Sequence, residues 1–306
     1  IHGVGILHDL HSRGWKDVHL LEKNKLGSGT SSRSTKLIHG GLRYLASPSQ
    51  IPLVSECLKE RQLLLELVPD LVHPIEILIP IYKNSPEKSW KIKAGLSLYD
   101  FLAGKKNIHK HRKLNKVELE KLKSFIKTKD LSNVFSYWDA QTNDKKLVTH
   151  IALSAEKLGA QISENTKVIL LSKDKLKWRI KVEDKEKNKC DIKADYIINC
   201  LGPWAHSIYD KKINITKLNS INNKGTHLVL KDIGINHAFL FYSPFDQRIF
   251  FLTPWQGKTL LGTTESQYTD DPSNVEVKQE EVDYLLKSVN TYLSAKLTES
   301  DVIDSF

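Results

Sequence analysis

Residues 29–45, Gly-Thr-Ser-Ser-Arg-Ser-Thr-Lys-Leu-Ile-His-Gly-Gly-Leu-Arg-Tyr-Leu, decide the fold of this chain. They come soon after an apolar segment, residues 18–22, that ends in an acid. Hydroxyl groups and backbone amides in that location can hold a pyrophosphate or a ring system. Gly40 and Gly41 let the backbone approach a flat ligand, and Arg43 offers a planar fork suited to phosphate. The stretch therefore indicates a nucleotide-cofactor loop joined to an anion-binding site.

The composition is that of a globular protein. The chain has 306 residues, of which 40% are hydrophobic and 27% charged, so we expect one large or two ordinary domains. Three cysteines without a close pair favour a reducing compartment over a disulfide scaffold. No apolar run approaches the roughly 18 residues of a membrane span, and we predict no metal site.

Apolar periodicity predicts a mixed α/β protein. We expect helices over residues 3–13, 53–68, 90–102, 147–158 and 282–293. Single strands are expected over residues 18–22, 75–82, 168–171, 178–182 and, as a buried strand, 192–200. The pattern then changes to three antiparallel strands over residues 225–230, 248–254 and 259–263.

The block from Thr30 to Leu45 resembles the signature of the aerobic, FAD-dependent glycerol-3-phosphate dehydrogenases. The resemblance continues, in the family's order, through residues 53–56, 95–100, 202–204, 224–227 and 262–264. One block of 16 residues with five ordered satellites is far more specific than a lone glycine motif.

The resemblance implies an FAD-binding Rossmann-like domain of the glutathione-reductase/D-amino-acid-oxidase type, discontinuous in sequence and combined with an antiparallel-sheet substrate domain. We expect residues 1–68 and 140–208 to form the FAD-binding domain. Residues 69–139 and 209–306 are expected to form the substrate-binding, or cap, domain. By the same resemblance Gly3 is the last glycine of the dinucleotide fingerprint. With no methionine anywhere in the chain, we expect residue 1 not to be the start of the protein, and the resemblance implies that the family sequence also continues beyond Phe306, so that this chain is a fragment lacking both termini.

The reaction implied is oxidation of sn-glycerol 3-phosphate to dihydroxyacetone phosphate, with hydride transferred to N5 of FAD. We expect Arg43 and Tyr44 to bind the phosphate, because Arg can grip it at two points and Tyr donates a further hydrogen bond. His227 is our candidate proton acceptor, since histidine titrates near neutral pH. The alternatives are a structural ion pair for Arg43, core packing for Tyr44, and for His227 a structural strand histidine whose hydrogen bonds are satisfied within the protein.

The expected cofactor contacts are an acid for the ribose, and hydroxyl or backbone groups for the rest of FAD. Glu22 follows Gly3 by 19 residues, about where an acid meets a ribose hydroxyl. Hydroxyl or backbone contacts are expected from residues near the signature and from later glycines. In full, the expected FAD-binding residues are Gly3, Glu22, Thr30, Ser31, Ser32, Lys36, Leu37, His39, Gly40, Gly41, Val168 and Gly202.

The net charge of +10 is concentrated in one segment. Residues 104–129 carry ten Lys/Arg against two Glu. Each cation near anionic lipid contributes roughly 1 kcal/mol, so this segment is a candidate membrane-surface contact. The alternative is a solvated basic stretch. We expect no nucleic-acid binding, because the segment lacks interleaved aromatic residues for stacking bases.

The family resemblance makes quinone the expected electron acceptor. It places the protein peripherally on the cytoplasmic face of the inner membrane, or on the mitochondrial inner membrane in a eukaryote, and allows a homodimer. A glycerol-3-phosphate oxidase that passes electrons to oxygen, and a non-catalytic FAD-binding module, are the two alternative functions.

Overall fold

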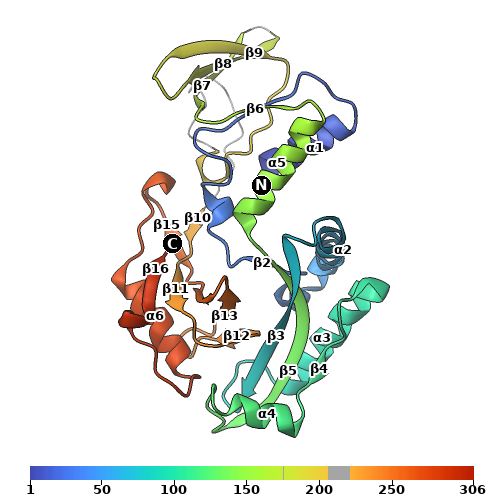
Figure 1. Cartoon of the computed structure of the whole chain (residues 1–306), viewed down its shortest axis with the longest axis vertical. Coiled ribbons are helices and arrows are strands. Elements are labelled where there is room, and N and C mark those ends of the chain that lie inside the picture. The colour runs from blue at the N-terminus through green and yellow to red at the C-terminus, as the bar shows by residue number, and fades with distance from the viewer. Residues whose placement is uncertain (175, 206–220) are drawn as a thin grey trace. The chain divides into compact units, whose positions relative to one another are not determined.

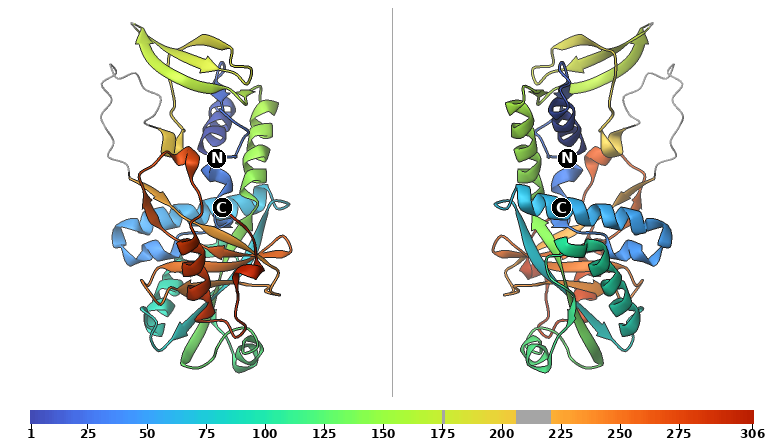
Figure 2. Two further views of the ribbon diagram at one scale, coloured as in Figure 1. Left: turned by 90° about the vertical axis from the view of Figure 1, so that its left-hand side faces the viewer. Right: turned by 90° about the vertical axis from the view of Figure 1, so that its right-hand side faces the viewer.

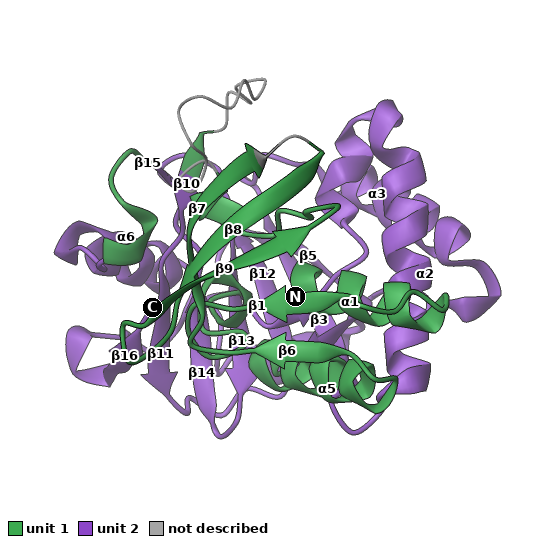
Figure 3. Ribbon diagram, turned by 90° about the horizontal axis from the view of Figure 1, so that it is seen from above, with its two compact units in different colours: residues 1–34, 143–222, 268–274 green, residues 35–142, 223–267, 275–306 purple. Residues whose placement is uncertain are grey.

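The computed structural model describes residues 1–174, 176–205 and 221–306 (Figure 1). The chain divides into two compact units (Figure 3). Unit 1 contains residues 1–34, 143–222 and 268–274, and unit 2 contains residues 35–142, 223–267 and 275–306. Both units are assembled from separate stretches of sequence, which agrees with the discontinuous arrangement expected.

Unit 1 is built around two helices that run side by side, α1 (His2–Ser12) and α5 (Asp144–Lys157) (Figure 2). They share small apolar clusters in which Val4 packs with Val148 and Leu7 with Ala155. Strands β1 (His19–Leu21) and β6 (Gln161–Ser163) pair in parallel beside them. This α/β arrangement is the one that the sequence predicts for the cofactor-binding part.

A three-stranded antiparallel sheet completes unit 1. It consists of β7 (Lys167–Asp174), β8 (Lys177–Glu183) and β9 (Lys189–Ala194). The buried strand predicted over residues 192–200 is wrong, because β9 ends at Ala194 and its residues are half-buried or exposed. Tyr196 and Ile198 are 81% and 55% exposed, and among the described residues no strand pairs with residues 195–200. Without a neighbour to accept its backbone hydrogen bonds, an apolar run does not form a strand.

Unit 2 contains one large sheet of nine described strands. Every pairing in it is antiparallel except that between β12 and β3, where Ala238 lies opposite Ile77. The predicted antiparallel sheet is therefore confirmed and is larger than expected. Its order is β16 (Val302–Ser305), β11 (His227–Lys231), β14 (Lys258–Gly262), β13 (Ile249–Trp255), β12 (Ala238–Tyr242), β3 (Val72–Tyr82), β5 (Leu131–Thr142) and β2 (Leu37–Ile38), with β4 (Arg112–Lys113) also paired to β5.

Helices cover both faces of this sheet. Successive side chains of a strand point to opposite faces, and apolar side chains on both faces are buried. On β3, Ile77 and Ile79 face one cluster and Leu78 faces the other. Helices α2 (Ile51–Leu67) and α3 (Ser89–Ala103) cover the first face. Helices α4 (Lys116–Leu122) and α6 (Gln279–Asn290) pack against the second. A short ribbon of β10 (Asn222–Lys224) and β15 (Ser266–Tyr268) lies outside the large sheet.

The unit boundaries differ from the expected domain boundaries. Residues 35–68 belong to unit 2, although the sequence assigns them to the cofactor domain. The reason is packing, because Val54 and Leu58 of α2 are buried against the sheet of unit 2. The expected boundary between residues 208 and 209 lies outside the described residues.

Candidate functional site

In unit 1, Gly3 brings helix α1 directly against strand β1. A Cβ atom at this position would lie 3.0 Å from Leu20 Cδ1, so a larger residue would require the Leu20 side chain to shift. Close helix–strand packing of this kind is one role of the last fingerprint glycine. Glu22, half-buried, directly follows β1, and its Oε1 accepts a hydrogen bond from the Asn24 amide at 2.9 Å. The structure thus places Gly3 and Glu22 at neighbouring elements.

The hydroxyl-rich turn of unit 1 is a short 3₁₀ helix, Thr30–Ser32, that begins after Gly29. Ser32 Oγ donates to the Gly29 carbonyl at 3.2 Å, and Thr30 is exposed. The turn is tied to α5 by Ser34, whose hydroxyl donates to Asp144 Oδ2 at 2.8 Å. Ser31 lies in the same turn and is half-buried.

Two further expected cofactor residues lie in unit 1. Val168 is on β7, opposite Val182 of β8. Gly202 begins a 3₁₀ turn with a φ of +53°, a conformation that favours glycine, and no heavy atom of the described residues lies within 4 Å of where its Cβ would be. The backbone conformation at position 202 therefore favours glycine, and no described residue fills the space beside it.

In unit 2, the loop after β2 is fixed by packing. A Cβ atom at Gly40 would lie 2.4 Å from both Leu58 Cδ2 and Tyr99 Oη, so only glycine fits. Gly41 has a φ of +82°, and its missing side chain leaves room for the Tyr44 ring. Both glycines therefore have a packing reason within the chain, and their expected contact with the flavin stays a prediction. His39, just before them, is exposed, and Leu37 is half-buried on β2.

Arg43 and Tyr44 form a pair in the 3₁₀ helix Leu42–Ala46. Arg43 Nη2 donates to Tyr44 Oη at 3.2 Å, and the guanidinium lies 5.0 Å from the centre of the Tyr44 ring. Arg43 is exposed, so its remaining donors face solvent. The pair presents a cation and a phenol together, which is a suitable arrangement for an oxyanion.

His227 is the first residue of β11 and is only 3% exposed. Its Nε2 lies 2.9 Å from Thr35 Oγ1, and its ring stacks on Phe306 with centroids 5.1 Å apart. A Cβ at Gly262 would lie 2.4 Å from His227 Cδ2. The imidazole is therefore held on three sides by Thr35, Phe306 and the Gly262 backbone.

Lys36 joins the same cluster. It is 6% exposed, and its Nζ lies 4.9 Å from the centre of the Phe306 ring and 5.8 Å from that of Trp255. The structure thus brings together Lys36 and His227 around Phe306. Within the described part of the chain, no hydrogen bond or ion pair joins Arg43 or Tyr44 to His227. Phe306 and Trp255 carry no signal in the sequence, whereas Thr35 lies inside the signature block.

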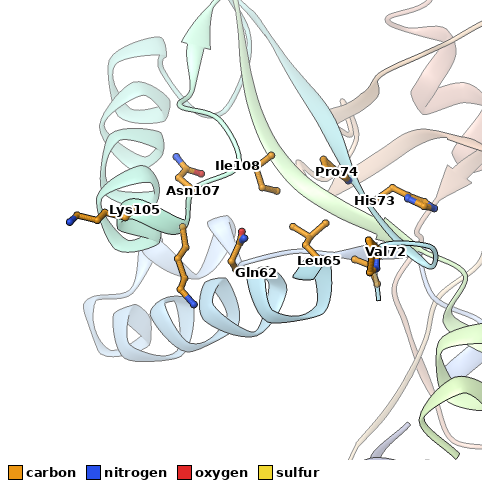
Figure 4. A pocket seen from close by; sticks show the side chains of 10 residues that line it. Gln62, Leu65, Val72, His73, Pro74, Lys105, Asn107 and Ile108 are labelled. Atoms are coloured by element: carbon orange, nitrogen blue, oxygen red, sulfur yellow. The ribbon is translucent and has the colours of Figure 1, made fainter. Parts of the chain in front are cut away.

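A pocket of about 360 Å³ in unit 2 contains none of the predicted site residues (Figure 4). Its wall includes Leu65 from α2, Pro74 from β3, and Lys105 from the basic segment. All ten cations of residues 104–129 are exposed, although Arg112 pairs with Glu76 and Glu118. The described residues include no group of His, Cys, Asp and Glu side chains able to hold a metal. None of the described helices is long and apolar enough for a membrane span.

Comparison with known proteins identifies the family. A family model described as FAD dependent oxidoreductase matches residues 1–306. The chain belongs to the FAD dependent oxidoreductase family. FAD is therefore its cofactor, and the close packing of Gly3 on β1 with Glu22 at the end of that strand fits a dinucleotide.

Individual relatives confirm the resemblance to glycerol-3-phosphate dehydrogenases. The chain is 36% identical over 318 residues to the glycerol-3-phosphate dehydrogenase of Synechocystis sp., covering 99% of this chain and 57% of that protein. It is 33% identical over 312 residues to the D-erythritol 1-phosphate dehydrogenase of Brucella abortus, covering 100% of this chain and 61% of that protein. The chain thus spans well under two thirds of these relatives.

A solved structure of the family shows the same fold. The glycerol-3-phosphate dehydrogenase from Bacillus halodurans, complexed with FAD, matches with a TM-score of 0.76 and 27% sequence identity. The match covers 99% of this chain and 53% of that chain. The FAD-binding α/β fold expected from the sequence is therefore confirmed for this family member.

Proposed function

We propose that this FAD dependent oxidoreductase oxidises sn-glycerol 3-phosphate at C2 to dihydroxyacetone phosphate and passes the electrons to quinone. The pair formed by exposed Arg43 and half-buried Tyr44 carries the proposal, together with the names of the relatives. A phosphate dianion is strongly hydrated, and only charged or well-aligned donors replace that hydration. Arg43, which is in contact with Tyr44 through a hydrogen bond and through its ring, offers such donors.

His227 is the proposed proton acceptor. Oxidation of the C2 alcohol releases one hydride and the hydroxyl proton. FAD, when bound, supplies the oxidant that takes the hydride. His227 takes the hydroxyl proton, and its contacts with Thr35 and Phe306 hold the ring in one orientation. General-base catalysis of this type contributes roughly 10²–10⁴ in rate.

Both units contain residues that we propose as FAD contacts. In unit 1 they are Gly3, Glu22, Thr30, Ser31, Ser32, Val168 and Gly202. In unit 2 they are Lys36, Leu37, His39, Gly40 and Gly41. Lys36 is the one buried cation among them, and its position over the Phe306 ring limits where its ammonium can donate.

The substrate proposal is tested by the visible spectrum of the full-length, FAD-loaded protein without oxygen. Glycerol 3-phosphate should bleach the flavin absorbance, whereas glycerol without phosphate should not. D-erythritol 1-phosphate is the informative competitor, because one relative bears its name and a phosphate clamp would accept both. Bleaching by D-erythritol 1-phosphate alone would overturn the assignment of the substrate.

Two measurements distinguish the proposed function from its two rivals: the identity of the electron acceptor, and whether any polyol phosphate bleaches the flavin. A glycerol-3-phosphate oxidase would form hydrogen peroxide stoichiometrically in air, whereas the proposed dehydrogenase would reduce a soluble quinone and form little peroxide. A non-catalytic FAD-binding module would stay yellow with every polyol phosphate. Each outcome therefore selects one of the three functions.

Membrane association is the second part of the proposal. The ten exposed cations of residues 104–129 can bind an anionic surface, and a membrane-bound quinone would then be within reach. Sedimentation with anionic vesicles tests this. Replacing Lys105, Lys106 and Lys110 with Gln should weaken binding, and unchanged binding would remove this segment from the proposal.

A further inference from the structure

A buried ion pair lies beneath the Gly40–Gly41 turn in unit 2. Arg61 of α2 and Asp139 of β5 both have side chains that are 0% exposed, and Arg61 Nη1 donates to Asp139 Oδ1 at 2.6 Å. Tyr99 of α3 donates its hydroxyl to the same oxygen at 2.7 Å. Three elements distant in sequence thus converge on one carboxylate oxygen.

The network reaches the signature turn through a backbone amide. The Gly40 N–H donates to Tyr99 Oη at 2.8 Å and to Asp139 Oδ1 at 3.2 Å. Burial raises the pKa of the Tyr99 hydroxyl well above 10.0, so the hydroxyl keeps its proton and donates to Asp139 while accepting from Gly40. The turn is therefore fixed at Gly40, three residues before Arg43.

Stability alone does not explain this network. Asp139 Oδ2 and Arg61 Nε and Nη2 are buried and have no hydrogen-bond partner among the described residues. Burying an ion pair whose polar atoms are only partly bonded costs free energy compared with an apolar replacement. Polar groups retained in such an environment serve best to fix one conformation.

We propose that Asp139, Arg61 and Tyr99 are positioning residues that hold the Gly40 amide and so present Arg43 and Tyr44 to the substrate phosphate. The inference rests on the proposed function. Arg61 neutralises Asp139, Asp139 orients the Tyr99 hydroxyl, and that hydroxyl holds the Gly40 amide. Gly41, in a left-handed conformation, then turns the chain so that the Tyr44 ring folds back over it. The network contacts neither substrate nor cofactor.

Tyr99→Phe in the full-length, FAD-loaded protein is the deciding variant. It removes the hydroxyl that links Gly40 to Asp139 and keeps the ring. Tyr137→Phe is the matched control, because Tyr137 packs edge-on against Tyr99 at 5.9 Å and does not hydrogen-bond to Asp139. Asp139→Asn is less decisive, because it leaves Arg61 buried without a counter-charge and so lowers stability as well.

The readouts are the KM for glycerol 3-phosphate, kcat, the dissociation constant of inorganic phosphate and Tm. We expect Tyr99→Phe to raise the KM and the phosphate dissociation constant together by about tenfold, with kcat little changed, while Tyr137→Phe leaves both near wild type. A Tyr99→Phe protein that differs from Tyr137→Phe only in Tm would show a merely structural role. If the wild type fails to oxidise glycerol 3-phosphate, the function is wrong, and the phosphate dissociation constants still decide the positioning inference.

Discussion

The hydroxyl oxygen of Thr35 lies 2.9 Å from Nε2 of His227, although 192 residues separate them in the sequence. Thr35 follows the hydroxyl-rich turn, and His227 opens strand β11. The contact links the signature block to the candidate proton acceptor inside unit 2. The contact also suggests a role for Thr35 in orienting the His227 imidazole, and nothing in the sequence indicates that these two residues are neighbours.

Thr35→Val should lower kcat of the full-length enzyme by about fivefold. The valine keeps the shape but cannot hydrogen-bond to Nε2, and losing one such bond is equivalent to roughly 1 kcal/mol. Thr35→Ser retains the hydroxyl and should restore most of the rate. Stopped-flow measurement of flavin bleaching gives the rates, and equal rates in Thr35→Val and wild type would exclude Thr35 from orienting His227.

Gly262→Ala should displace the His227 ring. The new Cβ would lie 2.4 Å from Cδ2 and 2.8 Å from Cγ of the ring, distances at which one side chain must move. We expect a loss of about 1–3 kcal/mol in the free energy of unfolding. The rate of flavin reduction should fall by about 10²-fold or more, because the proton acceptor is misplaced.

Gly95→Ala is the matched control for Gly262→Ala. Gly95 is in helix α3, and within the described part of the chain no heavy atom outside the helix backbone lies within 4 Å of where its Cβ would be. Alanine in a helix should therefore stabilise the protein by about 0.5–1 kcal/mol and leave the rate unchanged. Urea unfolding and the bleaching rate measure both variants, and similar behaviour of the two would contradict the steric argument.

Arg43→Lys should raise the KM for glycerol 3-phosphate by about 10- to 100-fold. Lysine keeps the charge but lacks the planar fork, so at least one charge-assisted hydrogen bond to phosphate is lost, worth roughly 1.5–3 kcal/mol. Tyr44→Phe keeps the ring beneath the guanidinium and should have a smaller effect. Steady-state kinetics with a soluble quinone provide the comparison, and an unchanged KM in Arg43→Lys would remove Arg43 from the phosphate site.

Glu281 should make stability depend on pH in the acid range. Burial alone raises its pKa, but hydrogen bonds from Lys224 Nζ at 2.5 Å and from the Lys278 amide outweigh this and hold the pKa below 4.5. Its stabilisation is therefore complete above pH 4.5 and is lost as pH falls through the folded-state pKa.

Glu281→Gln tests this dependence. The variant leaves Lys224, whose side chain is 4% exposed, without its carboxylate, so it should be less stable than wild type at neutral pH. The difference should narrow as pH falls, because Glu281 of the wild type becomes protonated. Glu280→Gln, an exposed neighbour, is the control. Urea midpoints at about pH 7, 5 and 3 give the curves, and parallel curves would disprove the coupling.

The sequence predicts well those helices and strands in which apolar residues recur at regular intervals. Helix α2 and strand β3 have regular apolar patterns, and both were expected close to their observed bounds. Strand β5, by contrast, is not predictable, although it is the longest described strand, because its buried positions include Ser136 and Asp139. Local pattern does not reveal that Arg61, from a helix far earlier in the chain, neutralises Asp139.

The sequence by itself determined the family, the cofactor and the type of fold, because a dense block of glycines, hydroxyls and cations is specific in its order along the chain. Only the tertiary structure decided how the residues that surround His227 and Gly40 are held. Those contacts join Thr35 to His227 and Gly40 to Tyr99 and Asp139 across 59 to 192 residues. Folding alone sets such neighbours, since hydrogen bonds and close packing depend on distance in space and not on separation along the chain.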